Sequence, residues 1–200
     1  MVNANGRHGN GLDEWAAPWR DYNFKSISIG DGVTSIGDYA FASNGVEVKL
    51  TIGKKVKRIG DCAFMDTGIK GTLTIPNSVQ TIGEGAFQQS AITKLVLGKG
   101  IKELGDYAFC YCPLKSVDAS KAKALETIGA ACFIRDGELN TIKINANKLK
   151  TVENASFRTE TTLKITVIAK SKNKYNKAVT LIKKGDQYNK TEFKFSYKKG

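Results

Sequence analysis

One nine-residue phrase recurs six times along the chain, at intervals of 22 to 24 residues. The clearest copies run from an apolar residue through a second apolar residue to a Gly, an acidic residue and an Ala-Phe pair. The four clearest copies are "VTSIGDYAF" (33–41), "VKRIGDCAF" (56–64), "VQTIGEGAF" (79–87) and "IKELGDYAF" (101–109), and two weaker ones span 125–133 and 149–157. Chance does not produce such regular spacing, so the chain is predicted to be a repeat array.

A second motif lies between the copies, in which two apolar residues flank one other residue. This period-2 alternation is typical of a short strand with one buried face. The motif is found at Ile27–Ile29, Leu50–Ile52, Leu73–Ile75, Leu95–Leu97, Val117–Ala119, Ile142–Ile144 and Ile165–Val167. Each repeat is therefore predicted to contain one short strand, an apolar step and a turn at the Gly-acidic-x-Ala-Phe phrase.

A single unit of this length cannot enclose its own apolar side chains, and stacked units cover one another. The repeats therefore predict a solenoid with a continuous core, whose equivalent Phe side chains form one column. Seven strands at about 4.8 Å spacing would make a ribbon of roughly 30 Å. The fold class that follows is a β-rich α/β solenoid of about six repeats, with short strands and short helical turns.

Acidic residues recur once per repeat at Asp38, Asp61, Glu84 and Asp106. In the turn they can cap or start one helical turn, because a carboxylate accepts hydrogen bonds from backbone N–H groups. The alternative is a set of paired carboxylates for acid–base catalysis. Their spacing puts them on successive layers at one edge of the solenoid, where capping accounts for them.

The two ends of the sequence are predicted to close the array, since outermost layers would expose apolar side chains. Trp15, Pro18, Trp19 and Tyr22 precede the first strand and are interpreted as a cap, with a ligand-binding aromatic patch as the alternative. Beyond the repeats, Tyr175, Ala178, Val179 and Ile182 have helical spacing, with Gly185 as a stop, and 193–197 alternates as a strand. The predicted organisation is therefore 1–24 tail and cap, 25–169 solenoid, and 170–200 Lys-rich cap.

Residues for catalysis or metal binding are scarce. His8 is the one histidine and lies in a Gly/Asn-rich tail, so histidine-assisted Ser or Cys catalysis is not expected. The four cysteines, Cys62, Cys110, Cys112 and Cys132, could form two disulfides or a zinc site, but neither their spacing nor the available partners support a metal, and Cys132 stands where other repeats have Ala. Structural thiols are the preferred interpretation, and we expect no enzyme activity, no metal and no cofactor.

The net charge of +12 suggests a polyanion partner, but it is concentrated at one end. Residues 170–200 hold ten Lys against Asp186 and Glu192, a net +8 that leaves +4 for the rest of the chain. A Lys-rich cap of this kind could neutralise several phosphates, and Phe193, Phe195 and Tyr197 superficially resemble a stacking platform. Core capping also accounts for these rings.

The phrases "LTIPNSVQTIGEGAF" (73–87) and "GVTSIGDYAF" (32–41) closely resemble the BspA-like, or Treponema-type, leucine-rich repeats. The resemblance extends over about 9–167 and implies a leucine-rich-repeat solenoid with its strands on the concave face. It also implies a bacterial surface or secreted protein, adhesion in some members, and no catalytic residues or cofactor. The family often has Cys after the Ala-Phe pair, where this chain has Asn44, Thr67, Ser90 and Cys112. Glu153 and Ser156 depart from the pattern in the sixth repeat.

A binding surface is expected on the outward strand positions, which form two rows of mostly small polar groups with intermittent Lys. The candidate partner-binding residues are Lys49, Thr51, Thr72, Thr74, Lys94, Val96, Asp118 and Lys143. Such a flat face favours a protein or glycan partner, possibly host-derived, over a small molecule in a deep pocket. The alternatives are a polyanion binder, for nucleic acid or wall polymers, acting through the Lys-rich cap, and a structural spacer.

The remaining expectations concern the cellular setting. No run of 18 apolar residues occurs, so insertion into a membrane is not expected. The first ten residues, MVNANGRHGN, lack the basic and then apolar pattern of a signal peptide. An extracellular or cell-surface location is expected from the family resemblance alone. The chain is expected to be a monomer, and nucleic acid is not the expected partner.

Overall fold

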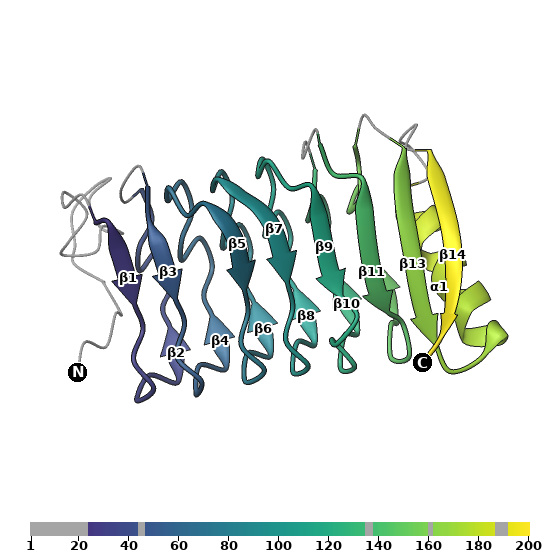
Figure 1. The fold of residues 1–200 in the computed structure, drawn as a ribbon, viewed down its shortest axis with the longest axis horizontal. Helices are drawn as coiled ribbons and strands as arrows, with labels where there is room; N and C mark the ends of the chain where they lie inside the picture. Colours follow the sequence, from purple (N-terminus) through teal and green to yellow (C-terminus); the bar gives the residue numbers. More distant parts are fainter. Residues whose placement is uncertain (1–23, 44–46, 135–137, 160–161, 187–191) are drawn as a thin grey trace.

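The computed structural model describes residues 24–43, 47–134, 138–159, 162–186 and 192–200, which form a stack of coils with a helix at one end (Figure 1). Each complete coil contributes one longer and one shorter strand, and the strands of each kind lie side by side along the stack. The predicted β-rich solenoid is confirmed. The aromatic cap proposed for Trp15, Pro18, Trp19 and Tyr22, and His8 and Asn44, lie outside the described residues.

The longer strands follow the predicted apolar motif and pair in parallel. They are β1 (Ser26–Ser28), β3 (Lys49–Thr51), β5 (Gly71–Thr74), β7 (Ile92–Val96), β9 (Ser116–Ala119), β11 (Thr141–Asn145), β13 (Leu163–Ala169) and β14 (Phe193–Lys199). Strands β5 to β14 form a six-stranded sheet, whereas β1 and β3 form a separate pair. Between β3 and β5 the described pairing is the isolated bridge Val48–Ile69, so the continuous ribbon expected from the repeats is interrupted.

Gly71 begins strand β5, just after this interruption, and its φ of +78° lies in the left-handed region, which glycine adopts without a steric penalty. The register between β5 and β7 also shifts here, because Gly71 pairs with Ile92 and Thr72 pairs with Lys94. The extra residue is therefore Thr93 of β7, and such a bulge bends its strand and locally disturbs the hydrogen-bond ladder.

The Val-x-x-Ile step forms a second parallel sheet that the sequence did not predict. Its strands are β2 (Ser35–Ile36), β4 (Arg58–Ile59), β6 (Thr81–Ile82), β8 (Glu103–Leu104), β10 (Thr127–Ile128) and β12 (Thr151–Val152). Two residues are too few for alternation to show in a sequence. In each strand the second residue is buried and the first is exposed or half-buried.

The Gly-acidic-x-Ala-Phe phrase forms turns that are hydrogen-bonded to the neighbouring coils, and not the short helical turn expected for it. The residue at x has a φ of 51–57° in all six copies, at Tyr39, Cys62, Gly85, Tyr107, Ala131 and Ala155. The N–H groups of this residue and of the Phe donate to carbonyls of the next coil, as in Cys62 to Glu84 (2.7 Å) and Phe64 to Ala86 (2.8 Å). These bonds between coils accompany turn bonds within a coil, such as that from the Gln88 N–H to the Gly85 carbonyl (3.0 Å).

The predicted Phe column is present. Phe41, Phe64, Phe87, Phe109, Phe133 and Phe157 stack in sequence, with ring centroids 5.2–5.8 Å apart and interplanar angles of 2–10°. From Phe64 onward each ring is at most 1% exposed. The rings join the buried Ile, Leu and Val side chains of both sheets in one hydrophobic cluster. This is the continuous core that the repeat length required.

The C-terminal helix and strand are also confirmed. Helix α1 (Lys172–Gly185) begins after Ser171, whose side chain accepts a hydrogen bond from the Lys174 N–H (3.3 Å), and it buries Ala178 and Ile182. The carbonyl of Gly185 accepts the Ala155 N–H (2.7 Å), the bond that the next coil supplies in earlier repeats. Gly185 does more than stop the helix, because a Cβ there would lie 2.6 Å from the Glu153 carbonyl oxygen. The helix therefore substitutes for a seventh coil.

Short polar side chains after the Ala-Phe pair bind each coil to the one before it. The Thr67 hydroxyl donates to the carbonyl of Phe41 (2.7 Å), and the Ser90 hydroxyl donates to that of Phe64 (3.3 Å). The Cys112 thiol donates to the Phe87 carbonyl at 3.1 Å. The three residue types thus fill one role, that of a small donor facing a buried carbonyl, which explains why they interchange at this position.

The four cysteines are present as thiols, in agreement with the structural interpretation. Cys110, Cys112 and Cys132 are at most 1% exposed, whereas Cys62 is half-buried. Burial raises the pKa of the Cys62 thiol, an effect partly offset by a hydrogen bond from Tyr39. A raised pKa leaves less of the reactive thiolate at a given pH.

We expect a thiol reagent at pH 8 to label the native protein slowly and at one position, Cys62. In denaturant all four thiols should react at once, which a colorimetric count of released thiolate measures. A Cys62→Ser variant is the control and should show no labelling in the native state. Rapid native labelling of more than one thiol would contradict the buried positions of Cys110, Cys112 and Cys132.

Candidate interaction surfaces

The outward positions of the longer strands fall into two straight rows, as predicted. Strand register aligns Thr72, Lys94, Ser116, Thr141, Lys164 and Lys194 in one row and Thr74, Val96, Asp118, Lys143, Thr166 and Ser196 in the other. The pairs Ser26–Lys49 and Ser28–Thr51 form corresponding short rows on the separate β1–β3 pair. We call this surface the long-strand face. Lys49 and Thr51 therefore lie on a different sheet from the other six candidate residues, because the ladder is interrupted between β3 and β5.

Most of the candidate side chains on the long-strand face are accessible to solvent. Thr72, Thr74, Lys94 and Lys143 are exposed, while Val96 and Asp118 are half-buried. Because the strands are hydrogen-bonded in register, side chains on adjacent strands sit about 4.8 Å apart. The face therefore presents a regular lattice of hydroxyls and ammonium groups on a rigid support.

Asp118 is the acidic group among the candidate residues. Its pKa lies below the usual value, because hydrogen bonds from Ser120 and the charges of Lys143 and Lys121 outweigh the opposing effect of partial burial. The Ser120 N–H donates to the Asp118 carboxylate at 3.0 Å. Asp118 and Lys143 are register partners on β9 and β11, so opposite charges meet at this point of the row.

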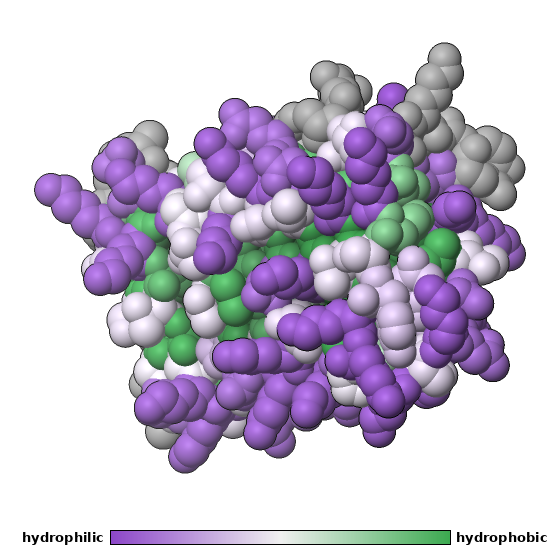
Figure 2. Space-filling view, turned by 45° about the vertical axis from the view of Figure 1, so that its right-hand side comes forward, coloured by the Kyte–Doolittle hydropathy of each residue, from purple (hydrophilic) through white to green (hydrophobic). Residues whose placement is uncertain are grey.

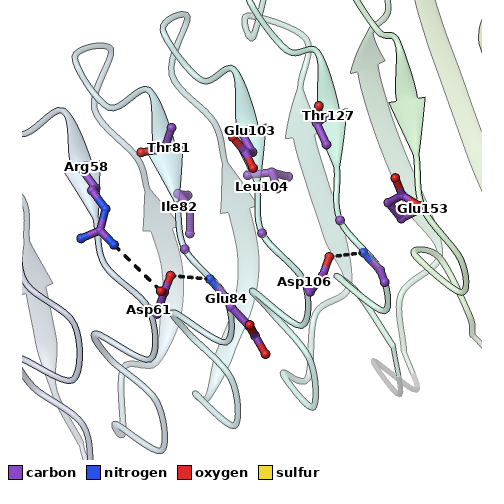
Figure 3. A pocket seen from close by; sticks show the side chains of 14 residues that line it. Arg58, Asp61, Thr81, Ile82, Glu84, Glu103, Leu104, Asp106, Thr127 and Glu153 are labelled. Atoms are coloured by element: carbon purple, nitrogen blue, oxygen red, sulfur yellow. Dashed lines mark hydrogen bonds and ion pairs between the residues drawn. The ribbon is translucent and has the colours of Figure 1, made fainter. Parts of the chain in front are cut away.

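A second candidate surface is a shallow acidic groove of about 620 Å³ along the short-strand sheet (Figure 3). Its acidic lining residues are Asp61, Glu84, Glu103, Asp106 and Glu153. Several of these carboxylates bind backbone N–H groups of the next coil. Asp61 accepts from Glu84 (3.0 Å), and Asp106 accepts from Ala130 (2.7 Å). Asp38, beside the groove, likewise accepts from the Asp61 N–H at 2.8 Å.

The acidic column therefore does cap backbone donors, but of the neighbouring coil and not of a helix. Arg58 adds an ion pair with Asp38 (2.8 Å) and a longer one with Asp61 (4.0 Å). Glu84 has one more methylene than Asp, and its side chain extends away from the backbone ladder (Figure 3). Carboxylates held in this way satisfy structural donors, which is the interpretation that the repeat spacing favoured. Within the described ranges no group of three or more His, Cys, Asp or Glu is arranged to hold a metal ion.

A third surface is a basic hollow of about 640 Å³ at the C-terminal end of the stack. It lies where β9, β11, β13 and β14 end, because carboxyl ends of parallel strands meet at one edge of a sheet. Its lining residues are Ser120, Lys123, Asn145, Asn147, Lys148, Ile168, Lys170, Lys174, Lys198, Lys199 and Gly200. Figure 2 brings this end of the molecule forward and shows hydrophilic side chains surrounding strips of hydrophobic surface.

Two of the six lysines of the basic hollow lie outside the Lys-rich segment predicted at the C-terminus. Lys123 and Lys148 precede the segment 170–200, to which the excess positive charge was assigned. Both follow a longer strand in its own coil, and stacking brings them beside Lys170, Lys174 and the end of β14. Aligning the residues that follow each strand motif would have placed these lysines at a common edge.

The comparison with protein families decides what the repeats are. The model of the BspA type leucine rich repeat region matches residues 19–122 and 70–179, with six copies. The chain belongs to the BspA-type leucine-rich-repeat family. Leucine-rich-repeat solenoids of this type are generally non-enzymatic scaffolds, and the family is often associated with cell surfaces and adhesion. A comparison with curated proteins finds no match.

The family match covers strands β1 to β13, the Phe column and the first part of helix α1, and ends before β14. The BspA-type repeat thus includes the long-strand face. None of the helices in the described parts of the chain is both long enough and apolar enough to cross a membrane.

Proposed function

We propose that this BspA-type chain is a non-enzymatic binding module that holds a protein or a glycan on its long-strand face. The observation that supports the proposal most directly is the register of β5 to β14. It aligns exposed Thr, Ser and Lys side chains in two straight rows over six strands. A rigid surface loses little conformational entropy on binding, which favours affinity.

The chemistry of the face fits a broad partner better than a small molecule. Hydroxyls of Thr72 and Thr74 and ammonium groups of Lys94 and Lys143 can hydrogen-bond carbonyls, carboxylates or sugar hydroxyls. The face forms a flat lattice, whereas small-molecule sites enclose most of their ligand. We further propose an extracellular or cell-surface location and a partner that includes host molecules, in keeping with the family.

Reversing two charges on the face tests the proposal. In the variant Lys94→Glu/Lys143→Glu, binding to the tightest partner in a panel of matrix proteins and immobilised glycans should weaken by about tenfold or more, because unlike charges become like charges. Surface plasmon resonance at low and high salt measures the change. Binding through the face should persist at high salt, since hydrogen bonds and packing contribute besides charge.

The matched control is Lys57→Glu/Lys102→Glu, which changes the net charge equally at exposed lysines just before β4 and β8. Its affinity should stay within about twofold of the unmodified chain. Equal losses in the two variants would contradict the assignment of the face. A chain that binds no member of the panel would instead favour the spacer alternative.

A further inference from the structure

We propose that the basic hollow is a second binding site, which takes the sulfate or carboxylate groups of an acidic glycan. It is distinct from the long-strand face, because its lining residues follow the strands and are not their outward positions. Its volume of about 640 Å³ lies within the range of ligand sites, so it can enclose a short glycan segment and not a folded domain.

The charge of the hollow is uncompensated. Six lysines line it, Lys123, Lys148, Lys170, Lys174, Lys198 and Lys199, with no Asp or Glu among the described lining residues. None of the six forms an ion pair with a carboxylate in the described part of the chain, although Lys70, Lys115 and Lys150 elsewhere do. Six like charges gathered around one concavity repel one another, and a bound anion would remove that repulsion.

The floor of the hollow is built from side chains that are already hydrogen-bonded. Asn145 is 4% exposed and donates to the Ser120 carbonyl at 3.2 Å. Asn147 accepts the Lys170 N–H (2.8 Å) through its side chain and the Lys174 ammonium (2.7 Å) through its carbonyl. These bonds join three coils and the helix, so the lysine stems start from fixed positions.

Helix α1 adds to the positive electrostatic potential of the hollow. Its N-terminus lies beside the hollow, where Lys174 is both a first-turn residue and a lining residue. The first turn has no acidic residue, although acidic side chains stabilise a helix at this end. An anion in the hollow would supply the missing negative charge.

The lining distinguishes an acidic glycan from nucleic acid. No aromatic ring lines the hollow among the described residues, whereas single-stranded nucleic acids are usually held by bases stacked on rings. The described lining also has no Arg, the side chain that binds phosphates and guanine edges in a bidentate way. The rings of Tyr175 and Tyr197 instead contact each other and Lys172, outside the hollow.

The variant Lys123→Gln/Lys148→Gln tests the site, because both lysines lie outside the Lys-rich segment 170–200. We expect the chain to bind a short heparin-derived oligosaccharide in calorimetric titration, and the variant to bind at least about tenfold more weakly. The salt dependence should fall by about two released counterions, one for each lysine. Deleting 170–200 is unsuitable, because it would remove Ala178 and Ile182 from the core.

The matched control is Lys177→Gln/Lys184→Gln, which removes two exposed charges of α1 that do not line the hollow. Its affinity should change by less than about twofold. Equal losses in both variants would show that the diffuse charge of the cap binds the glycan and would overturn the proposal. So would tighter binding of a single-stranded oligonucleotide of equal charge, or no binding of the oligosaccharide. Oligosaccharide binding to the variant Lys94→Glu/Lys143→Glu separates this site from the long-strand face, because that variant leaves all six lysines of the hollow in place.

Discussion

Replacing Phe87 with Ala should lower the free energy of unfolding by about 3–5 kcal/mol, the range for truncating a buried Phe. Phe87 is fully buried and stacks on two rings, Phe64 at 5.2 Å and Phe109 at 5.3 Å. The substitution leaves a cavity between coils and removes both ring contacts. Chemical denaturation followed by circular dichroism measures the loss as a lower midpoint.

Two further variants make the Phe87 result specific to the column. Phe87→Leu keeps most of the volume and should cost less than half as much. Phe41→Ala should also cost less than half, because Phe41 is half-buried and so loses less burial on truncation than the fully buried Phe87. Similar losses for Phe87→Ala and Phe41→Ala would contradict a column that carries the core.

The second large effect is expected at Gly105, where Ala should destabilise the protein by about 3 kcal/mol through overpacking. A Cβ at Gly105 would lie 2.6 Å from the Gly83 carbonyl carbon and 2.7 Å from the Glu84 nitrogen. These are backbone atoms of the preceding coil, so they cannot move aside as a flexible side chain could. The coils would have to separate, against the hydrogen bonds that hold them.

Thermal unfolding measures this effect, and about 3 kcal/mol corresponds to a decrease in Tm of roughly 6–12 °C for a chain of this size. Gly32→Ala is the control, since a Cβ there meets no heavy atom within 4 Å. Its stability should change by less than about 0.5 kcal/mol or rise slightly, because Ala restricts the unfolded chain. If Gly105→Ala were as stable as Gly32→Ala, the close approach of Gly105 to the backbone of Gly83 and Glu84 would be wrong.

The repeat period accounts for most of what could be predicted. It placed the strands, the Phe column and the two outward rows, because in a parallel stack residues one period apart become neighbours. The helical periodicity of 175–182 similarly placed α1 on the core through Ala178 and Ile182. These features depend on residues of the same kind at equal spacing, which a sequence displays directly.

The features that could not be predicted depend on backbone geometry or on residues of different repeats. The left-handed residue in each turn is variously Tyr, Cys, Gly or Ala, so no residue type announces it. The bulge between β5 and β7 arises from one extra residue, Thr93, within an otherwise regular repeat. The basic hollow combines Lys123 and Lys148, which follow the strand motif in two repeats, with Lys198 of β14, which lies beyond the repeats.

The bond between the Gly185 carbonyl and the Ala155 N–H has a consequence for how such arrays change size. The Ala155 N–H needs a carbonyl oxygen at this position, and either a further coil or the end of α1 can provide it. Gain or loss of one internal repeat would leave this junction unaltered, since the same kind of N–H to carbonyl bond joins the earlier coils. An array of this kind can therefore lengthen or shorten by whole repeats while it keeps the same C-terminal helix.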